Sequence, residues 1–132
     1  MKKYSSCMLV DDEMDLLDVL KANLECLFER IDTCSDGQQA FEQIRSNQYD
    51  LIVSDVQMPH MKGDELLRNL RTHGIVTPFI CMSGNGNRIQ MMETKKQGAV
   101  VYMEKPFDFD LFLEEIKIVM ESEPGKHRKF RV

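Results

Sequence analysis

Short apolar runs alternate with longer helix-periodic segments along almost the whole chain, and this alternation constrains the fold more than any other feature. The apolar runs resemble buried strands and lie at residues 6–10, 31–35, 50–55, 78–82 and 99–103. Between them, apolar residues recur at three- and four-residue spacing, which predicts helices at residues 13–28, 38–46, 64–72, 87–96 and after Asp108. Such alternation predicts an α/β protein whose parallel sheet is covered by helices on both faces.

Right-handed crossovers between parallel strands restrict the order of the strands in the sheet. The natural order for five strands is 2-1-3-4-5, with the reversal between the first and third strands. We therefore expect the flavodoxin-like (βα)5 fold, a doubly wound parallel sheet. Gly98 is suited to the C-terminal cap of the fourth helix and Asp108 to the N-terminal cap of the fifth.

Helix periodicity also predicts which side chains face the core. In the first helix the expected inward residues are Leu17, Leu20, Leu24, Leu27 and Phe28, and in the last helix Phe109, Phe112, Leu113, Ile116 and Met120. Leu111 and Ile118 point nearly opposite the inner face of the last helix and lie one heptad apart. We expect them to form an exposed apolar stripe, with Met91 exposed beside an inward Met92 on the fourth helix.

Length and charge indicate one domain followed by a short tail. The chain has 132 residues, 17 basic and 22 acidic, and we assign residues 1–122 to the domain and residues 123–132 to a basic tail. The tail carries Lys126, Arg128, Lys129 and Arg131, so the rest of the chain has a net charge of about −9. An acidic domain is not suited to direct nucleic-acid binding, and a short charged tail is expected to be solvated.

The four cysteines, Cys7, Cys26, Cys34 and Cys81, show no spacing typical of a metal site or redox motif. All four lie in apolar runs and are expected to be buried, reduced thiols. The sequence has no apolar run of membrane-spanning length and no long apolar core after Met1. We therefore expect a cytoplasmic protein without a membrane partner.

Polar residues capable of chemistry follow four of the five predicted strands. They are Asp11, Asp12 and Glu13 after the first strand, Asp55 at the end of the third, Ser83 and Gly84 after the fourth, and Lys105 after the fifth. Ligands of doubly wound sheets bind beyond the carboxyl ends of the strands, near the reversal of strand order. Each residue alone has an ordinary explanation as a turn or cap residue, whereas the joint pattern predicts one site.

Clustered carboxylates repel one another unless a cation lies between them. Mg²⁺ uses oxygen ligands and is commonly held by one or two carboxylates together with waters and phosphate oxygens. Lys105 and Ser83 are suited to donate to a phosphoryl group, and an aspartate carboxylate can act as the nucleophile that accepts it. The residues thus predict Mg²⁺-dependent phosphoryl chemistry.

The same residues lie in motifs that resemble the receiver domains of response regulators, the phosphorylation switches of two-component systems. The motifs are VDDE at Val10–Glu13, DVQMP at Asp55–Pro59 followed by Gly63, MSG at Met82–Gly84 and EKPF at Glu104–Phe107. The resemblance extends from Tyr4 to Glu121. Its combined motifs are highly specific, although each one alone is weak.

By matching position, the resemblance implies that Asp55 is the phosphoacceptor. Asp12 and Asp55 would bind Mg²⁺ directly, with the backbone carbonyl of Gln57 as the third protein ligand. Asp11 would hold a metal-bound water and face Lys105.

The resemblance also implies how the signal is transmitted. Ser83 and Lys105 would hold phosphate oxygens, and Tyr102 matches the aromatic switch position of the family. On phosphorylation, Ser83 would move toward the phosphoryl group and Tyr102 would follow into the vacated space. Gln57 and Asn85 occupy positions at which the family tunes the lifetime of the phosphoryl group.

The implied function is a signalling switch and not an enzyme that turns over a metabolite. The phosphoryl group would come from a sensor histidine kinase, a phosphotransfer protein or a small phosphodonor, and it would be lost slowly by autodephosphorylation. Phosphorylation would change the face formed by the fourth helix, the fifth strand and the fifth helix. An output domain, an effector protein or a second copy of the chain would bind there, and standalone, relay and transcriptional contexts all fit the sequence.

Two other classes of protein share parts of this pattern. A haloacid-dehalogenase-type phosphatase also uses an aspartate nucleophile after a strand, but its motif has a D-x-D spacing that Asp11-Asp12-Glu13-Met14 breaks. A flavin-binding module of the same fold needs a phosphate loop rich in serine, threonine and glycine after the first strand, where this chain has acids. Both alternatives are therefore less consistent with the sequence than the receiver.

Overall fold

The computed structural model describes residues 3–58, 60–84, 88–106 and 108–122. The strands are β1 (Tyr4–Val10), β2 (Phe28–Cys34), β3 (Leu51–Asp55), β4 (Phe79–Ser83) and β5 (Val101–Glu104). The helices are α1 (Met14–Leu24), α2 (Gly37–Ser46), α3 (Gly63–Thr72), α4 (Arg88–Lys96) and α5 (Phe109–Glu121). The predicted alternation of five strands and five helices is confirmed.

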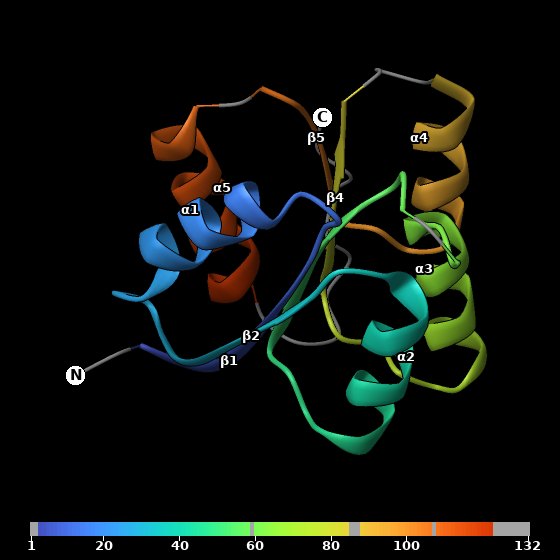
Figure 1. Ribbon diagram of the computed structural model, residues 1–132, viewed down its shortest axis with the longest axis horizontal. Coiled ribbons are helices and arrows are strands. Elements are labelled where there is room, and N and C mark those ends of the chain that lie inside the picture. The colour runs from blue at the N-terminus through green and yellow to red at the C-terminus, as the bar shows by residue number, and fades with distance from the viewer. Residues whose placement is uncertain (1–2, 59, 85–87, 107, 123–132) are drawn as a thin grey trace.

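All strand pairs are parallel, and the sheet order is β2-β1-β3-β4-β5, as predicted. Figure 1 shows the two helical layers: α1 and α5 cover one face of the sheet, and α2, α3 and α4 cover the other. The order reverses between β1 and β3, so the ends of these two strands lie side by side without a covering crossover. This is the doubly wound flavodoxin-like fold.

Each face of the sheet has its own hydrophobic core. Leu17, Leu20, Phe112 and Ile116 pack beneath α1 and α5 with side chains of one sheet face. The second core includes Leu66, Leu67, Leu70, Ala40 and Phe41 beneath α2 and α3. β1, β3, β4 and β5 are largely buried on both faces, which explains their nearly continuous apolar sequences, whereas edge strand β2 has exposed polar residues.

The boundary between α1 and β2 differs from the prediction. The helix ends at Leu24 instead of continuing to Phe28, and Phe28 is the first residue of β2. Leu27 and Phe28 are both buried, as expected, but as part of the loop and strand. Leu27 and Phe28 are apolar because they pack on the same core as α1. Their spacing from Leu24 matches the helical period only by coincidence.

Two predictions about exposure were wrong. Cys26 is exposed because it follows the end of α1, whereas the other three cysteines are buried; all four are free thiols. On α4 the expected order is inverted: Met91 packs against the core and Met92 is 51% exposed. Thr94, one turn after Met91, is buried, so Met91 and Thr94 share the inner side of α4.

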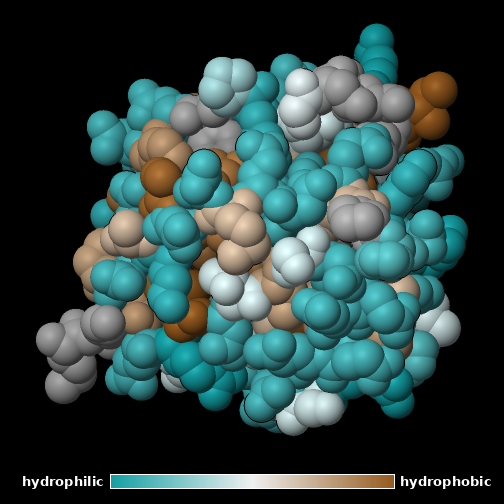
Figure 2. Space-filling model, viewed as in Figure 1, coloured by the Kyte–Doolittle hydropathy of each residue, from teal (hydrophilic) through white to brown (hydrophobic). Residues whose placement is uncertain are grey.

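The predicted features of α5 and its neighbours are confirmed. The Asp108 carboxylate caps α5 by accepting a hydrogen bond of 2.8 Å from the Asp110 N–H, and Gly98 has a φ of 97° after α4. Leu111 and Ile118 are 50% and 44% exposed. Figure 2 shows apolar side chains at the surface on the side of α1 and α5.

None of the helices in the described part of the chain is long and apolar enough to cross a membrane. The basic tail at residues 123–132 and Asn85 lie outside the described residues. The division into a domain and a tail therefore stays a prediction.

Candidate functional site

The predicted site residues occupy the carboxyl end of the sheet, next to the reversal of strand order. Asp11 directly follows β1, and its N–H donates to the Cys34 carbonyl at the end of β2. Asp55 is the last residue of β3 and Ser83 the last of β4. Lys105 follows β5, and its backbone N–H donates to the Ser83 carbonyl over 2.7 Å. Parallel pairing therefore brings four separate segments to one edge.

Lys105 joins the acidic residues of the site. Its Nζ lies 2.7 Å from Oδ2 of Asp11, 3.3 Å from Oδ2 of Asp55 and 3.3 Å from Oε1 of Glu13. Asp11 is 0% exposed and Asp55 is 4% exposed, so their interactions with the ammonium group are shielded from water. The predicted contact between Asp11 and Lys105 is thus present.

Asp11, Asp12 and Asp55 form a three-carboxylate cluster. One oxygen from each residue lies within 4.8 Å of the others, and Asp12 is the exposed member. Oxygen-only donors at this spacing, with one member open to solvent, fit Mg²⁺, which retains water ligands. The cluster therefore suits the cation that the sequence predicts.

Burial shapes the protonation of the two inner carboxylates. Burial, together with the charge of Asp11, raises the pKa of Asp55 from 3.8 to about 6, although Lys105 opposes the change. Burial also raises the pKa of Asp11 against the opposing effect of its hydrogen bond with Lys105. Ionised Asp55 is therefore held in an unfavourable environment that a bound cation would relieve.

The same carboxylates keep Lys105 charged. Burial alone acts to lower the pKa of its ammonium group, but the hydrogen bond to Asp11 and the charges of Asp55 and Glu13 outweigh burial and raise the pKa. Lys105 thus remains a cation at neutral pH, next to the place where a negatively charged group would bind.

The loop after β3 is supported by close backbone packing. The Gln57 N–H donates to Oδ1 of Asp55 over 3.3 Å, and the Gly63 N–H donates to the Val56 carbonyl over 3.0 Å. A Cβ atom at Gly63 would lie 2.2 Å from the Asp55 carbonyl oxygen, and one at Gly37 would lie 2.3 Å from the Met61 carbonyl oxygen. The starts of α2 and α3 thus pack directly against this loop.

Ser83 and Tyr102 lie behind the acidic cluster. Ser83 is 0% exposed and Tyr102, on β5, is 1% exposed. Burial raises the pKa of the Tyr102 hydroxyl, while nearby Ser83 acts in the opposite direction. The hydroxyl is buried without a hydrogen-bond partner among the described residues. The ring of the predicted switch residue is therefore already in a buried position.

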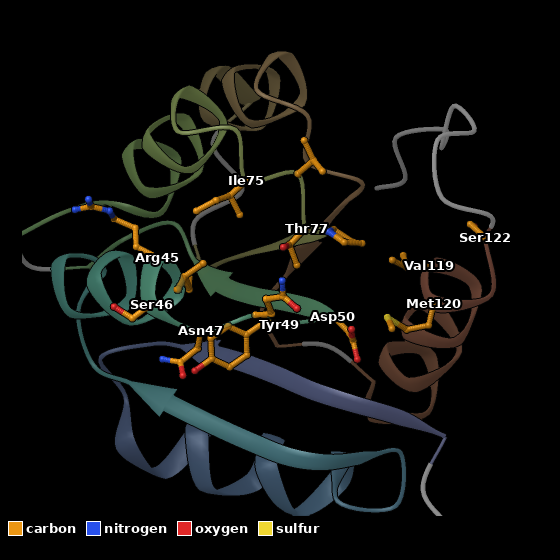
Figure 3. A pocket seen from close by; sticks show the side chains of 14 residues that line it. Arg45, Ser46, Asn47, Tyr49, Asp50, Ile75, Thr77, Val119, Met120 and Ser122 are labelled. Carbon is orange, nitrogen blue, oxygen red and sulfur yellow. The ribbon is translucent and has the colours of Figure 1, made fainter.

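Two hollows flank the sheet, at opposite edges. A cavity of about 450 Å³ adjoins the acidic site and is lined by Glu13, Leu16, Gly84, Lys105, Pro106 and Phe109. A groove of about 910 Å³ lies at the amino ends of β3 and β4, among Arg45, Tyr49, Asp50, Thr77 and Met120 (Figure 3). No predicted site residue lines this second groove, so the chemistry belongs to the carboxyl edge.

Sequence reasoning missed two features of the site. Glu13 had no role of its own in the sequence-based prediction, yet its side chain contacts Lys105. The two residues lie 92 positions apart, and no sequence pattern indicates their contact. Gly63 was named as part of a motif, whereas its lack of a Cβ permits close contact with the Asp55 backbone. A glycine a few residues after a strand-terminal aspartate was the available signal for Gly63.

The fold and the site together define a flavodoxin-like α/β protein with an acidic, lysine-containing site at the reversal of strand order. The model of the response regulator receiver domain family matches residues 7–117. The chain belongs to this family. Receivers are the phosphorylation switches of two-component systems, signalling proteins and not metabolic enzymes, and they bind Mg²⁺ in general.

Relatives and solved structures agree with this assignment. The chain is 30% identical to response regulator ArlR of Staphylococcus saprophyticus over 91% of its own length and 54% of the relative. It is 32% identical to the transcriptional regulatory protein ZraR of Klebsiella oxytoca over 78% of its length and 23% of the relative. The receiver domain of the Francisella response regulator 1452 is 30% identical with a TM-score of 0.81, covering 88% of this chain and 96% of that one. The chain thus spans about half, or less, of these two curated relatives.

Proposed function

We propose that Asp55 accepts a phosphoryl group from the phosphohistidine of a sensor histidine kinase or phosphotransfer protein, or from a small phosphodonor. The observation that carries the proposal is the position of Asp55, a buried carboxylate at a strand end whose Oδ2 lies 3.3 Å from the Lys105 ammonium group. A carboxylate oxygen of Asp55 bonds to phosphorus as the bond from phosphorus to the donor nitrogen or oxygen breaks. The leaving imidazole or carboxylate departs with the electron pair of that bond.

Asp12 and Asp55 would hold Mg²⁺ directly, the Gln57 carbonyl would complete the protein ligands, and Asp11 would act through a bound water. When bound, the cation neutralises the charge that gathers on the phosphoryl oxygens. Lys105 would stabilise the same charge, and Ser83 would donate a hydrogen bond to a phosphoryl oxygen. Catalysis in this proposal consists of positioning and charge neutralisation. Water later hydrolyses the aspartyl phosphate and regenerates Asp55.

Phosphorylation would shift an equilibrium between two conformations of the face formed by α4, β5 and α5. The buried Tyr102 hydroxyl supports this part of the proposal. Ser83 and Tyr102 lie on the adjacent strands β4 and β5, and both are buried, so a movement of Ser83 toward the phosphoryl group would change the packing around the Tyr102 ring. The face would bind an output domain, an effector protein or a second copy of the chain.

Intact-mass spectrometry after incubation with acetyl phosphate and Mg²⁺ tests the proposal. We expect one phosphoryl group per chain and none in Asp55→Asn. Asp18→Asn is the control, because Asp18 is an exposed acid on α1 that is not part of the three-carboxylate cluster. An adduct that persists in Asp55→Asn and maps to another residue would contradict the assignment of the phosphoacceptor.

A further inference from the structure

The Lys105 ammonium group is surrounded by carboxylates, and it donates hydrogen bonds to Asp11 and Glu13. An ammonium group has three N–H bonds, and the Lys105 ammonium lies within 3.3 Å of three carboxylates, those of Asp11, Glu13 and Asp55. A phosphoryl oxygen that binds Lys105 therefore competes with these contacts.

The three carboxylates differ in how readily they can be replaced. Asp11 is buried and makes the shortest contact, 2.7 Å. Asp55 carries the reacting oxygen itself. Glu13 makes a longer contact, 3.3 Å, and its side chain is 65% exposed, so water can take the place of Lys105 at little cost. Glu13 is the partner that Lys105 can release.

The conformation of Glu13 is consistent with a role directed at Lys105. Glu13 occupies the N-cap position of α1, but its side chain makes no capping hydrogen bond. Its backbone N–H instead donates to Oδ1 of Asp11 over 2.9 Å, while its carboxylate contacts Lys105. Glutamate is also not among the residues preferred for N-caps. Both parts of Glu13 thus bind the pair formed by Asp11 and Lys105.

Glu13 also lies on a route to the lysine. The cavity of about 450 Å³ beside the site is lined by Glu13 and Gly84 together with Lys105. A phosphodonor that approaches Lys105 through this cavity passes the Glu13 carboxylate, whose charge repels a negatively charged donor.

We propose that Glu13 is a positioning residue that holds Lys105 toward α1 and releases it when a phosphoryl group arrives. By doing so, Glu13 slows phosphorylation of Asp55 and discriminates against donors of high negative charge. The inference rests on the proposed function of Asp55 and Lys105. It adds a residue that restrains the reaction instead of promoting it.

Phosphorylation rates of the full chain, measured by intact mass at saturating Mg²⁺, test the inference. We expect Glu13→Gln to react about two- to fivefold faster than wild type with acetyl phosphate, the range that an exposed ion pair contributes. The gain should be smaller with phosphoramidate, which carries less negative charge, and smaller for both donors at high ionic strength. Asp15→Asn removes the same charge from the first turn of α1, where Asp15 is not among the described carboxylates that contact Lys105, and it should react like wild type.

Equal or slower reaction of Glu13→Gln relative to Asp15→Asn overturns the inference, as does an equal gain with both donors. A crystal structure with beryllofluoride and Mg²⁺ gives an independent readout. We expect the distance between Oε1 of Glu13 and Nζ of Lys105 to exceed about 4 Å, the limit of an ion pair; an intact contact overturns the inference. A wild-type chain that is never phosphorylated would instead refute the proposed function itself.

Discussion

Gly63 packs so closely against Asp55 that a Cβ atom at position 63 would lie 2.2 Å from the Asp55 carbonyl oxygen. Gly63 begins α3, and Asp55 ends β3. The start of the helix therefore sets the path of the backbone that carries the proposed phosphoacceptor. The contact is with backbone atoms, which cannot rotate away as a flexible side chain can.

Gly63→Ala is expected to displace this loop and to lower the free energy of unfolding by about 1–3 kcal/mol, as overpacking does elsewhere. Phosphorylation by acetyl phosphate should slow as Asp55 moves. Gly84→Ala is the control for stability, because a Cβ atom there would meet none of the described residues within 4 Å. Urea unfolding of both variants checks the prediction, and equal stability of the two would show that the contact relaxes without cost.

Stability should depend on pH through Asp55. The folded state raises the pKa of Asp55 from 3.8 to about 6, so between these values the folded chain binds more protons than the unfolded chain. The contribution of Asp55 therefore lowers stability as pH rises from about 4 to 6, and the full penalty persists above this range.

Asp55→Asn removes that penalty and should stabilise the Mg²⁺-free protein by about 3 kcal/mol at neutral pH, since the rise in pKa spans about two units and each corresponds to about 1.4 kcal/mol. The gain should vanish near pH 4. Urea unfolding in the presence of a chelator at both pH values measures it. A gain that is the same at both pH values would rule out ionisation of Asp55 as its cause.

Lys105→Ala should weaken activation more than Mg²⁺ binding, because the lysine is placed to meet the phosphoryl group while the cation is held by acids. The variant leaves buried Asp11 without its 2.7 Å partner, which should lower stability by about 1–3 kcal/mol at neutral pH. Beryllofluoride binding and Mg²⁺ titration, measured separately, check the difference. Parallel collapse of both affinities would contradict the proposed role.

The exposed residues Leu111 and Ile118 on α5 are expected to contribute to a surface that binds a partner after phosphorylation. Replacing both with lysine should leave phosphorylation of Asp55 intact and abolish association that depends on phosphorylation. Val19→Lys is a matched control, since Val19 is 43% exposed but lies on α1, outside the face formed by α4, β5 and α5. Size-exclusion chromatography with and without beryllofluoride and Mg²⁺ compares the proteins, and undiminished association of the double variant would refute the prediction.

Local sequence patterns were sufficient for most of the architecture, and they failed where two elements share one apolar pattern. The spacing from Leu24 to Phe28 fits a helix, but Phe28 begins β2. The prediction that Met92 is buried and Met91 exposed was wrong, because α4 has few apolar residues from which the sequence could define its inner face. Cys26 is exposed because it lies in the turn after α1. Apolar neighbours in the sequence do not reveal which way the side chain of a turn residue points.

The sequence by itself determined the alternation of strands and helices, and with it the position of each acid or lysine at a strand end. Because parallel strands end at one edge, this local information placed Asp11, Asp12, Asp55, Ser83 and Lys105 together. The tertiary structure alone decided that Glu13 reaches Lys105, that Gly63 touches Asp55 and that Tyr102 is buried. These contacts depend on distances between segments far apart in the chain, which follow from packing and leave no periodic pattern in the sequence.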